Sequence, residues 1–284
     1  MIETFDNSML GQFKDCPRKF HWRYVRHLIP LYEKNFVTGF GSALHDAMAE
    51  WYSTKDSKKM DKAFVDSWLP HEGQDETGKR SMLRGLTITR QYRETFTNEP
   101  FDIISPEYVE TGFTMELGNH LICGKIDAIV EWKLLTRGIV TLEHKFSNSK
   151  GYLVCEPNAQ LDTYIWAASK IMGKPVIGAY LNQVYHTAKD VNKNEFVREL
   201  TYRTEDKINE WEKDTLFYIG LIDRCEREEI WPKNTKHCGA YHRACEYTRL
   251  CKITDKVERE EIIPLLYRVE QWNPFPNARE GGEE

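Results

Sequence analysis

Two short apolar segments near the middle of the chain, separated by only a few residues, restrict its fold most strongly. The segment GKIDAIVEW ends at Trp132 and the segment GIVTLEHKF begins at Gly138, with the link KLLTR between them. Apolar strands on both sides of so short a link predict an antiparallel hairpin. Both segments also carry charged residues, and unpaired charges normally lie outside a fold.

The hairpin register brings three of these charges together. Asp127 and Glu143 are equidistant from residue 135 in the link, so an antiparallel hairpin centred there places them opposite or nearly opposite each other. Lys145 follows Glu143 by two residues, and a strand directs both side chains to one face. Two carboxylates suit Mg²⁺ or Mn²⁺, and a neighbouring lysine can orient or help deprotonate a water molecule. For Asp127 alone, a solvated strand residue is the simpler alternative.

The rest of the chain predicts helices around a central mixed β-sheet, an α/β or mixed α+β fold. A helix is expected from a cap at Asn7 or Ser8, with Pro17 interrupting it. Another is expected to open at the glycines of GFGSALHDAMAEWYS. The remaining predicted elements are helices between residues 58 and 97, strands within 101–132, a helix over 158–173, strands over 176–187 and 195–203, and a long helix over 204–229.

These elements suggest one domain over residues 1–270. It would comprise an N-terminal helical region, a helical insertion at 46–100, a sheet core at 101–202, and a long helix with a cysteine-rich segment at 203–255. The acidic residues 271–284 are expected to be a disordered tail.

The composition is that of an ordinary globular protein. Of 284 residues, 40% are hydrophobic and 29% are charged, with a net charge of −5. No apolar run approaches the length of a membrane span, and MIETFDNSML lacks a basic segment followed by an apolar one. We therefore expect a cytoplasmic protein without a membrane partner.

The segment FKDCPRKFHWRYVRHL is basic and rich in aromatic residues, although the chain as a whole is acidic. Its Arg18, Lys19 and Arg23 are candidates to contact a nucleic-acid backbone. A solvated basic helix face is the simpler alternative.

Three of the seven cysteines crowd into HCGAYHRACEYTRLC, at Cys238, Cys245 and Cys251. An odd number of cysteines in a reducing compartment argues against disulfides and favours metal ligation. Zinc would accept these three together with His242, and free buried thiols are the remaining alternative.

Five motifs in order resemble the PD-(D/E)XK nuclease superfamily, in particular its RecB-like branch. GKIDAIVEW and TLEHKFS resemble the catalytic core, with Asp127 as the aspartate and Glu143 and Lys145 in E-x-K. SMLGQFKDCPRKFHWRY, GSALHDAM and QLDTY resemble the N-terminal helix, the G-x-x-x-H motif and the Q-x-x-x-Y motif. The branch includes the AddB nuclease subunit and iron–sulfur exonucleases of CRISPR adaptation, and such proteins are common in phages. An upstream glutamate of the family corresponds to either Glu107 or Glu110.

The resemblance implies roles for individual residues. His45, Asp127 and Glu143 would bind Mg²⁺ or Mn²⁺ with the backbone carbonyl of His144, and Lys145 would place the attacking water. Gln160 and Tyr164, on one helix face, would contact the nucleic acid or support the site. Simple packing is the alternative for this pair and for His45.

Several members of this branch carry a [4Fe–4S] cluster that joins the two chain ends. By resemblance, Cys16 in CPRKF would bind it with Cys238, Cys245 and Cys251. The family places a ligand where this chain has His242, but the usual four thiolates favour Cys238.

The resemblance therefore implies a Mg²⁺- or Mn²⁺-dependent DNA nuclease, an exonuclease acting on DNA ends or single strands in recombination, repair or phage DNA processing. It would work in the cytoplasm of a bacterium or a phage-infected cell, with a helicase or recombinase as a possible partner. The alternatives are a non-catalytic DNA-binding or scaffold subunit and a zinc-dependent nucleic-acid-binding protein.

Overall fold

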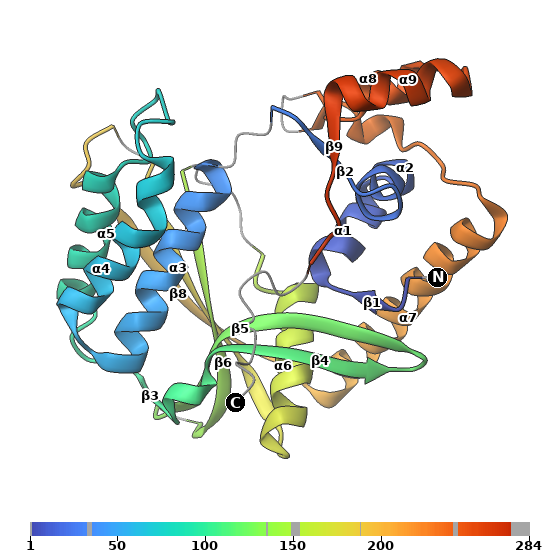
Figure 1. Ribbon diagram of the computed structural model, residues 1–284. Helices are drawn as coiled ribbons and strands as arrows, with labels where there is room; N and C mark the ends of the chain where they lie inside the picture. The colour runs from blue at the N-terminus through green and yellow to red at the C-terminus, as the bar shows by residue number, and fades with distance from the viewer. Residues whose placement is uncertain are drawn as a thin grey trace, which may run out of the picture. The chain divides into compact units, whose positions relative to one another are not determined.

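The computed structural model describes residues 2–32, 36–134, 136–148, 154–187, 189–240 and 244–273 (Figure 1). The chain divides into two compact units. The sheet unit contains Lys34–Phe113 and Lys125–Asn209, and the cysteine unit contains Met1–Glu33, Thr114–Gly124 and Glu210–Glu284. A single domain over residues 1–270 stays a prediction. Residues 274–284 of the predicted tail lie outside the described residues.

A mixed sheet forms the centre of the sheet unit, as predicted. Strand β5 (His120–Trp132) pairs with β4 (Val109–Leu117) and is antiparallel to β3 (Phe101–Ile103) and β6 (Gly138–Ser147). Strand β7 (Val176–Tyr185) runs parallel to β6, and β8 (Glu195–Tyr202) runs antiparallel to β7. Ala128 lies opposite Leu142, which is the predicted hairpin register.

Helices cover this sheet. Helices α3 (Phe36–Thr54), α4 (Ser57–Trp68) and α5 (Met82–Thr95) pack together in Figure 1 and share a core with alternate strand residues such as Val140 and Leu142. Helix α6 (Ala159–Met172) contacts β6 and β7. It begins after the cap Asn158 and ends at Gly173, whose φ of 61° suits glycine.

Two helices start earlier than the sequence predicts. Asp6, not Asn7 or Ser8, caps α1 (Asn7–Asp15), because its carboxylate accepts a hydrogen bond of 2.7 Å from the Met9 amide. Helix α3 begins before the glycines that were expected to open it. Gly39 instead lies inside α3, where a Cβ would come within 2.6 Å of the His71 ring.

The cysteine unit combines segments from the N-terminal and C-terminal parts of the described chain. Strand β1 (Thr4–Phe5) runs parallel to the first residues of β5, and β2 (Leu28–Pro30) is antiparallel to β9 (Tyr267–Val269). Helix α2 (Pro17–Phe20) starts at the predicted interruption and continues into the π-helical turn η1 (His21–Val25). The other elements of this unit are most of α7 (Glu205–Glu228), η4 (Thr235–His237), α8 (Thr248–Lys252) and α9 (Lys256–Leu266); η2 (Leu69–His71) and η3 (Pro106–Tyr108) belong to the sheet unit.

Within the described part of the chain, no helix combines the length and the apolar character needed to cross a membrane.

Candidate active site

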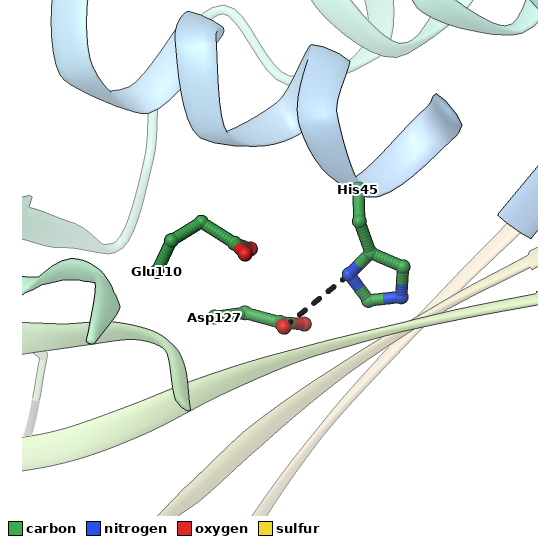
Figure 2. A group of neighbouring side chains, drawn as sticks. All are labelled: His45, Glu110 and Asp127. Carbon is green, nitrogen blue, oxygen red and sulfur yellow. Dashed lines mark ion pairs between the residues drawn. The ribbon is translucent and has the colours of Figure 1, made fainter. Parts of the chain in front are cut away.

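Three side chains from different elements of the sheet unit converge on one point. His45 comes from α3, Glu110 from β4 and Asp127 from β5, and one ligand atom of each lies within 4.8 Å of the others (Figure 2). The closest pair is His45 Nδ1 and Asp127 Oδ1, which are 3.3 Å apart. An imidazole and two carboxylates form a donor set that suits a divalent cation.

The structure brings Glu110 into this group, whereas Glu107 lies exposed in η3. Glu110 adopts a φ of 55°, a left-handed conformation that is uncommon for residues other than glycine. Such conformations cluster at binding and catalytic sites. Lys125 forms an ion pair with the Glu110 carboxylate. Residue spacing alone cannot distinguish the two glutamates, because the backbone turn at Glu110 directs its side chain.

Glu143 and Lys145 lie on the same face of β6, as predicted, and begin a chain of polar contacts. Lys145 Nζ is 2.5 Å from Glu143 Oε1 and donates a hydrogen bond of 2.7 Å to Gln160 Oε1. Gln160 Nε2 in turn donates to the Tyr164 hydroxyl at 2.9 Å. The E-x-K and Q-x-x-x-Y motifs therefore meet through Lys145 and Gln160.

The second oxygen of Glu143 is buried and has no hydrogen-bond partner among the described residues. A buried carboxylate oxygen without a partner is costly, and a cation would remove that cost. His45, Glu110, Asp127 and Glu143 therefore offer donors of the right chemistry for Mg²⁺ or Mn²⁺.

His144 turns its side chain to the opposite face of β6 from Glu143 and Lys145. Its backbone N–H donates a hydrogen bond of 2.6 Å to Asp127 Oδ2, which leaves Oδ1 facing His45. Its ring Nδ1 lies 2.7 Å from Asn182 Nδ2. That the His144 carbonyl binds a metal stays a prediction.

Burial and neighbouring charges shift the pKa values of the site in opposite directions. Burial favours the neutral acid of Asp127, but the charge and hydrogen bond of His45 and the His144 amide outweigh it and hold the pKa of Asp127 well below its usual range. Burial disfavours the charged form of His45, yet Asp127 raises the pKa of the imidazole to about 9. The two groups form an ion pair at neutral pH.

Burial and the negative charge of Asp127 both raise the pKa of Glu143, to about 7, although Lys145 opposes the shift. The same two causes raise the pKa of Glu110, against the effect of Lys125. The charge of Asp127 thus repels the carboxylates of both Glu110 and Glu143, as in sites that bind divalent cations.

In the cysteine unit, Cys16, Cys238, Cys245 and Cys251 line one pocket with Lys19 and Lys233. All four are free thiols. The Asn234 amide donates to Cys16 Sγ at 3.3 Å, and the Cys245 amide donates to the Cys238 carbonyl at 2.8 Å. His242, the alternative ligand, lies outside the described residues.

The three basic residues expected to bind DNA also have partners within the cysteine unit. Arg18 Nε donates to the Trp231 carbonyl at 2.7 Å, and Lys19 forms an ion pair of 3.0 Å with Glu246. Arg23 donates a long hydrogen bond of 3.5 Å to the Glu270 carbonyl. These contacts join the N-terminal and C-terminal segments of that unit, and a role in binding DNA stays a prediction.

Comparison with known proteins bears on the same residues. A family model of the PD-(D/E)XK nuclease superfamily matches residues 7–252. The crystal structure of a "Putative exonuclease" from Eubacterium rectale is similar, with 13% identity and a TM-score of 0.50 over 89% of this chain and 90% of that chain, which bears on the fold alone. SSO0001 is 17% identical over 76% of each chain, but its TM-score of 0.32 carries no argument. No curated protein matches in sequence.

Proposed function

Because this chain belongs to the PD-(D/E)XK nuclease superfamily, we propose that it is a divalent-metal-dependent deoxyribonuclease that hydrolyses phosphodiester bonds. The observation that carries this proposal is the convergence of His45, Glu110 and Asp127. Glu143 and Lys145, with the spacing of the superfamily motif, belong to the same group of interacting charges.

The donors suggest how the site works. A divalent cation held by His45, Asp127 and Glu143, with Glu110 in reach, would polarise the phosphate and lower the pKa of a bound water. Lys145 is held between Glu143 and Gln160, a position from which its ammonium group can orient the attacking water. The His144 amide keeps Asp127 oriented and ionised.

We further propose that the enzyme is a RecB-like exonuclease acting on DNA ends or single strands. Support comes from the ordered motifs and from a similar fold in the Eubacterium protein called a "Putative exonuclease". Arg18, Lys19 and Arg23 would contact the DNA backbone. Recombination, repair or phage DNA processing in a bacterial cytoplasm, with a helicase or recombinase partner, would suit such an activity.

The pocket in the cysteine unit supports a [4Fe–4S] cluster bound by Cys16, Cys238, Cys245 and Cys251. Four thiolates are the usual ligand set of such a cluster, and all four of these cysteines line the pocket. A local zinc site at Cys238, His242, Cys245 and Cys251 would not need Cys16.

The test is a cleavage assay on end-labelled linear and covalently closed circular DNA, each single-stranded and duplex. We expect Mg²⁺- or Mn²⁺-dependent release of labelled products from linear DNA, no cutting of circles, and no activity in Lys145→Ala. Cleavage of circles would show an endonuclease. DNA binding without cleavage by wild-type protein in either metal would support the scaffold alternative.

A further inference from the structure

A row of polar side chains crosses three neighbouring strands and begins at His144, whose backbone N–H binds Asp127 of the candidate metal site. His144 on β6 pairs in register with Asn182 on β7, and Asn182 pairs with Arg198 on β8. Residues that are opposite one another on adjacent strands present their side chains on the same face. All three side chains are largely buried; the Arg198 side chain, for example, is 7% exposed.

Hydrogen bonds connect this row from end to end. Arg198 Nε donates to Asn182 Oδ1 at 3.1 Å, and Asn182 Nδ2 lies 2.7 Å from His144 Nδ1. Arginine has donors only, so it requires the amide oxygen of Asn182 to face it. The amide nitrogen then faces His144 and can only donate, so Nδ1 accepts and the ring proton lies on Nε2.

Residues from helices α3 and α5 and from the loop after α5 hold the two ends of the row. Arg198 forms a bidentate ion pair with Glu99, at 2.6 and 3.1 Å, and donates to the Tyr92 hydroxyl at 2.6 Å. The Tyr52 ring stacks on the His144 ring at a centroid distance of 5.6 Å and an interplanar angle of 20°. A buried polar network in which each member is bonded favours one arrangement of its members.

We propose that Asn182 and Arg198 are positioning residues for the metal site, acting through His144. The row fixes the His144 ring, and the ring fixes the backbone of β6 at the point where the His144 N–H binds Asp127 Oδ2. Asp127 Oδ1 is thereby kept on the side of His45. Hydrogen-bonded partners behind metal ligands act in the same way in other metal sites.

The inference rests on the proposed function, and Asn182→Leu tests it. This variant retains the approximate volume of the side chain and removes its hydrogen bonds to Arg198, His144 and the Tyr92 hydroxyl. We expect Mn²⁺ affinity, measured by calorimetry, to fall about 10-fold to 100-fold, with a lower kcat and an unchanged KM for DNA. In ¹⁵N spectra of histidine-labelled protein, the single Nε2–H form of His144 should give way to a mixture.

Val140→Ala is the matched control. Val140 is buried on the same strand and belongs to the hydrophobic core rather than to the polar row. It should lower the unfolding midpoint without changing the Mn²⁺ affinity or the His144 signal. Tyr92→Phe, which removes only one hydroxyl from the network, is a milder second variant and should weaken Mn²⁺ binding less than Asn182→Leu.

The two proposals fail in different ways. Normal Mn²⁺ affinity and kcat in both Asn182→Leu and Tyr92→Phe, with an active wild-type enzyme, would overturn the positioning role alone. An equal loss of Mn²⁺ affinity in Val140→Ala would also overturn it, because the effect would then follow from stability. A wild-type protein without metal-dependent cleavage would overturn both proposals.

Discussion

At the residue scale, the site holds an ionised aspartate and a glutamate that is half protonated near neutral pH. The His144 amide and His45 stabilise the charge of Asp127. Glu143 is buried with one unpartnered oxygen and lies in the field of Asp127. A bound metal ion would offset the cost of burying the Glu143 charge. We therefore expect this charge to lower the stability of metal-free protein.

Glu143→Gln should therefore stabilise the metal-free protein and abolish its activity. The neutral amide removes a buried charge whose pKa is raised from 4.5 to about 7, so metal-free protein at pH 8 should gain up to about 3 kcal/mol in its free energy of unfolding. Nuclease activity should be lost. Urea unfolding with a chelator present measures the first effect, and a less stable variant would contradict the proposed strain.

The stability of metal-free protein should fall as pH rises from about 5 to 9. His45 has its pKa raised from 6.5 to about 9, so its contribution is complete below 6.5 and is lost toward 9. The pKa of Glu143 is raised from 4.5 to about 7, so its contribution to stability is lost as the pH rises between those values. The pKa of Asp127 is lowered, so its stabilisation is lost only at more acidic pH.

Thermal unfolding with and without Mg²⁺ measures this dependence. Mg²⁺ competes with the protons on His45 and Glu143, so its stabilising effect should be larger at pH 8.5 than at pH 6. Asp127→Asn removes the partner of His45 and serves as the control, with a flatter pH profile for the metal-free protein. A Mg²⁺ effect that is equal at both pH values would count against a site that binds metal and protons in competition.

At the element scale, the fold depends on how closely helices of the sheet unit approach one another. Gly85 of α5 faces the Phe64 ring of α4, and a Cβ there would overlap the ring. Gly41 of α3 has no neighbouring atom within 4 Å of an added Cβ. Glycine is thus required at the first position and is an ordinary helix residue at the second.

The two alanine substitutions should consequently differ in sign. Gly85→Ala should destabilise the protein by about 1–3 kcal/mol through overpacking. Gly41→Ala should stabilise it by about 0.5–1 kcal/mol, because alanine favours the helical state. Chemical denaturation of both variants measures the change in the free energy of unfolding. Equal changes would mean that Gly85 does not determine the spacing between α4 and α5.

Regular hydrophobic periodicity predicted which segments form helices and strands. It did not predict features that depend on side-chain contacts between elements. The hairpin register followed from the position of the short link, because in an antiparallel pair the turn determines which residues lie opposite each other. The start of α3 could not be predicted in this way. Gly39 lies inside the helix, where it packs against the His71 ring, and does not mark the helix start. The row from His144 to Arg198 joins residues far apart in sequence, which no local pattern reveals.

At the scale of the whole molecule, the cysteine unit brings together residues from the N-terminal and C-terminal parts of the described chain. Trp22 and Leu28 share a core with Tyr247, Leu250 and Tyr267. The four candidate cluster ligands line a pocket in the same unit. Their sequence positions predicted this grouping only through the family resemblance, because residue spacing alone cannot show that Cys16 meets the others.

Cys16→Ser should abolish iron binding and lower the thermal unfolding midpoint, because the chain ends would lose a common anchor. Cys225→Ser is the matched control, since Cys225 belongs to the same unit but does not line the pocket. Iron and zinc should be quantified on anaerobically purified samples. Unchanged iron content in Cys16→Ser would assign the cluster to other ligands, and zinc in place of iron would show a different site.

The most direct measurement of the central claim is a titration of wild-type and Asp127→Asn protein with Mn²⁺ up to millimolar concentration. Electron paramagnetic resonance would report the free Mn²⁺ at each step. Because His45, Glu110 and Asp127 converge, wild-type protein should bind Mn²⁺ at a site that the Asp127→Asn variant lacks. Loss of that site together with cleavage would support a metal-dependent nuclease. Identical binding curves for the two proteins would contradict it.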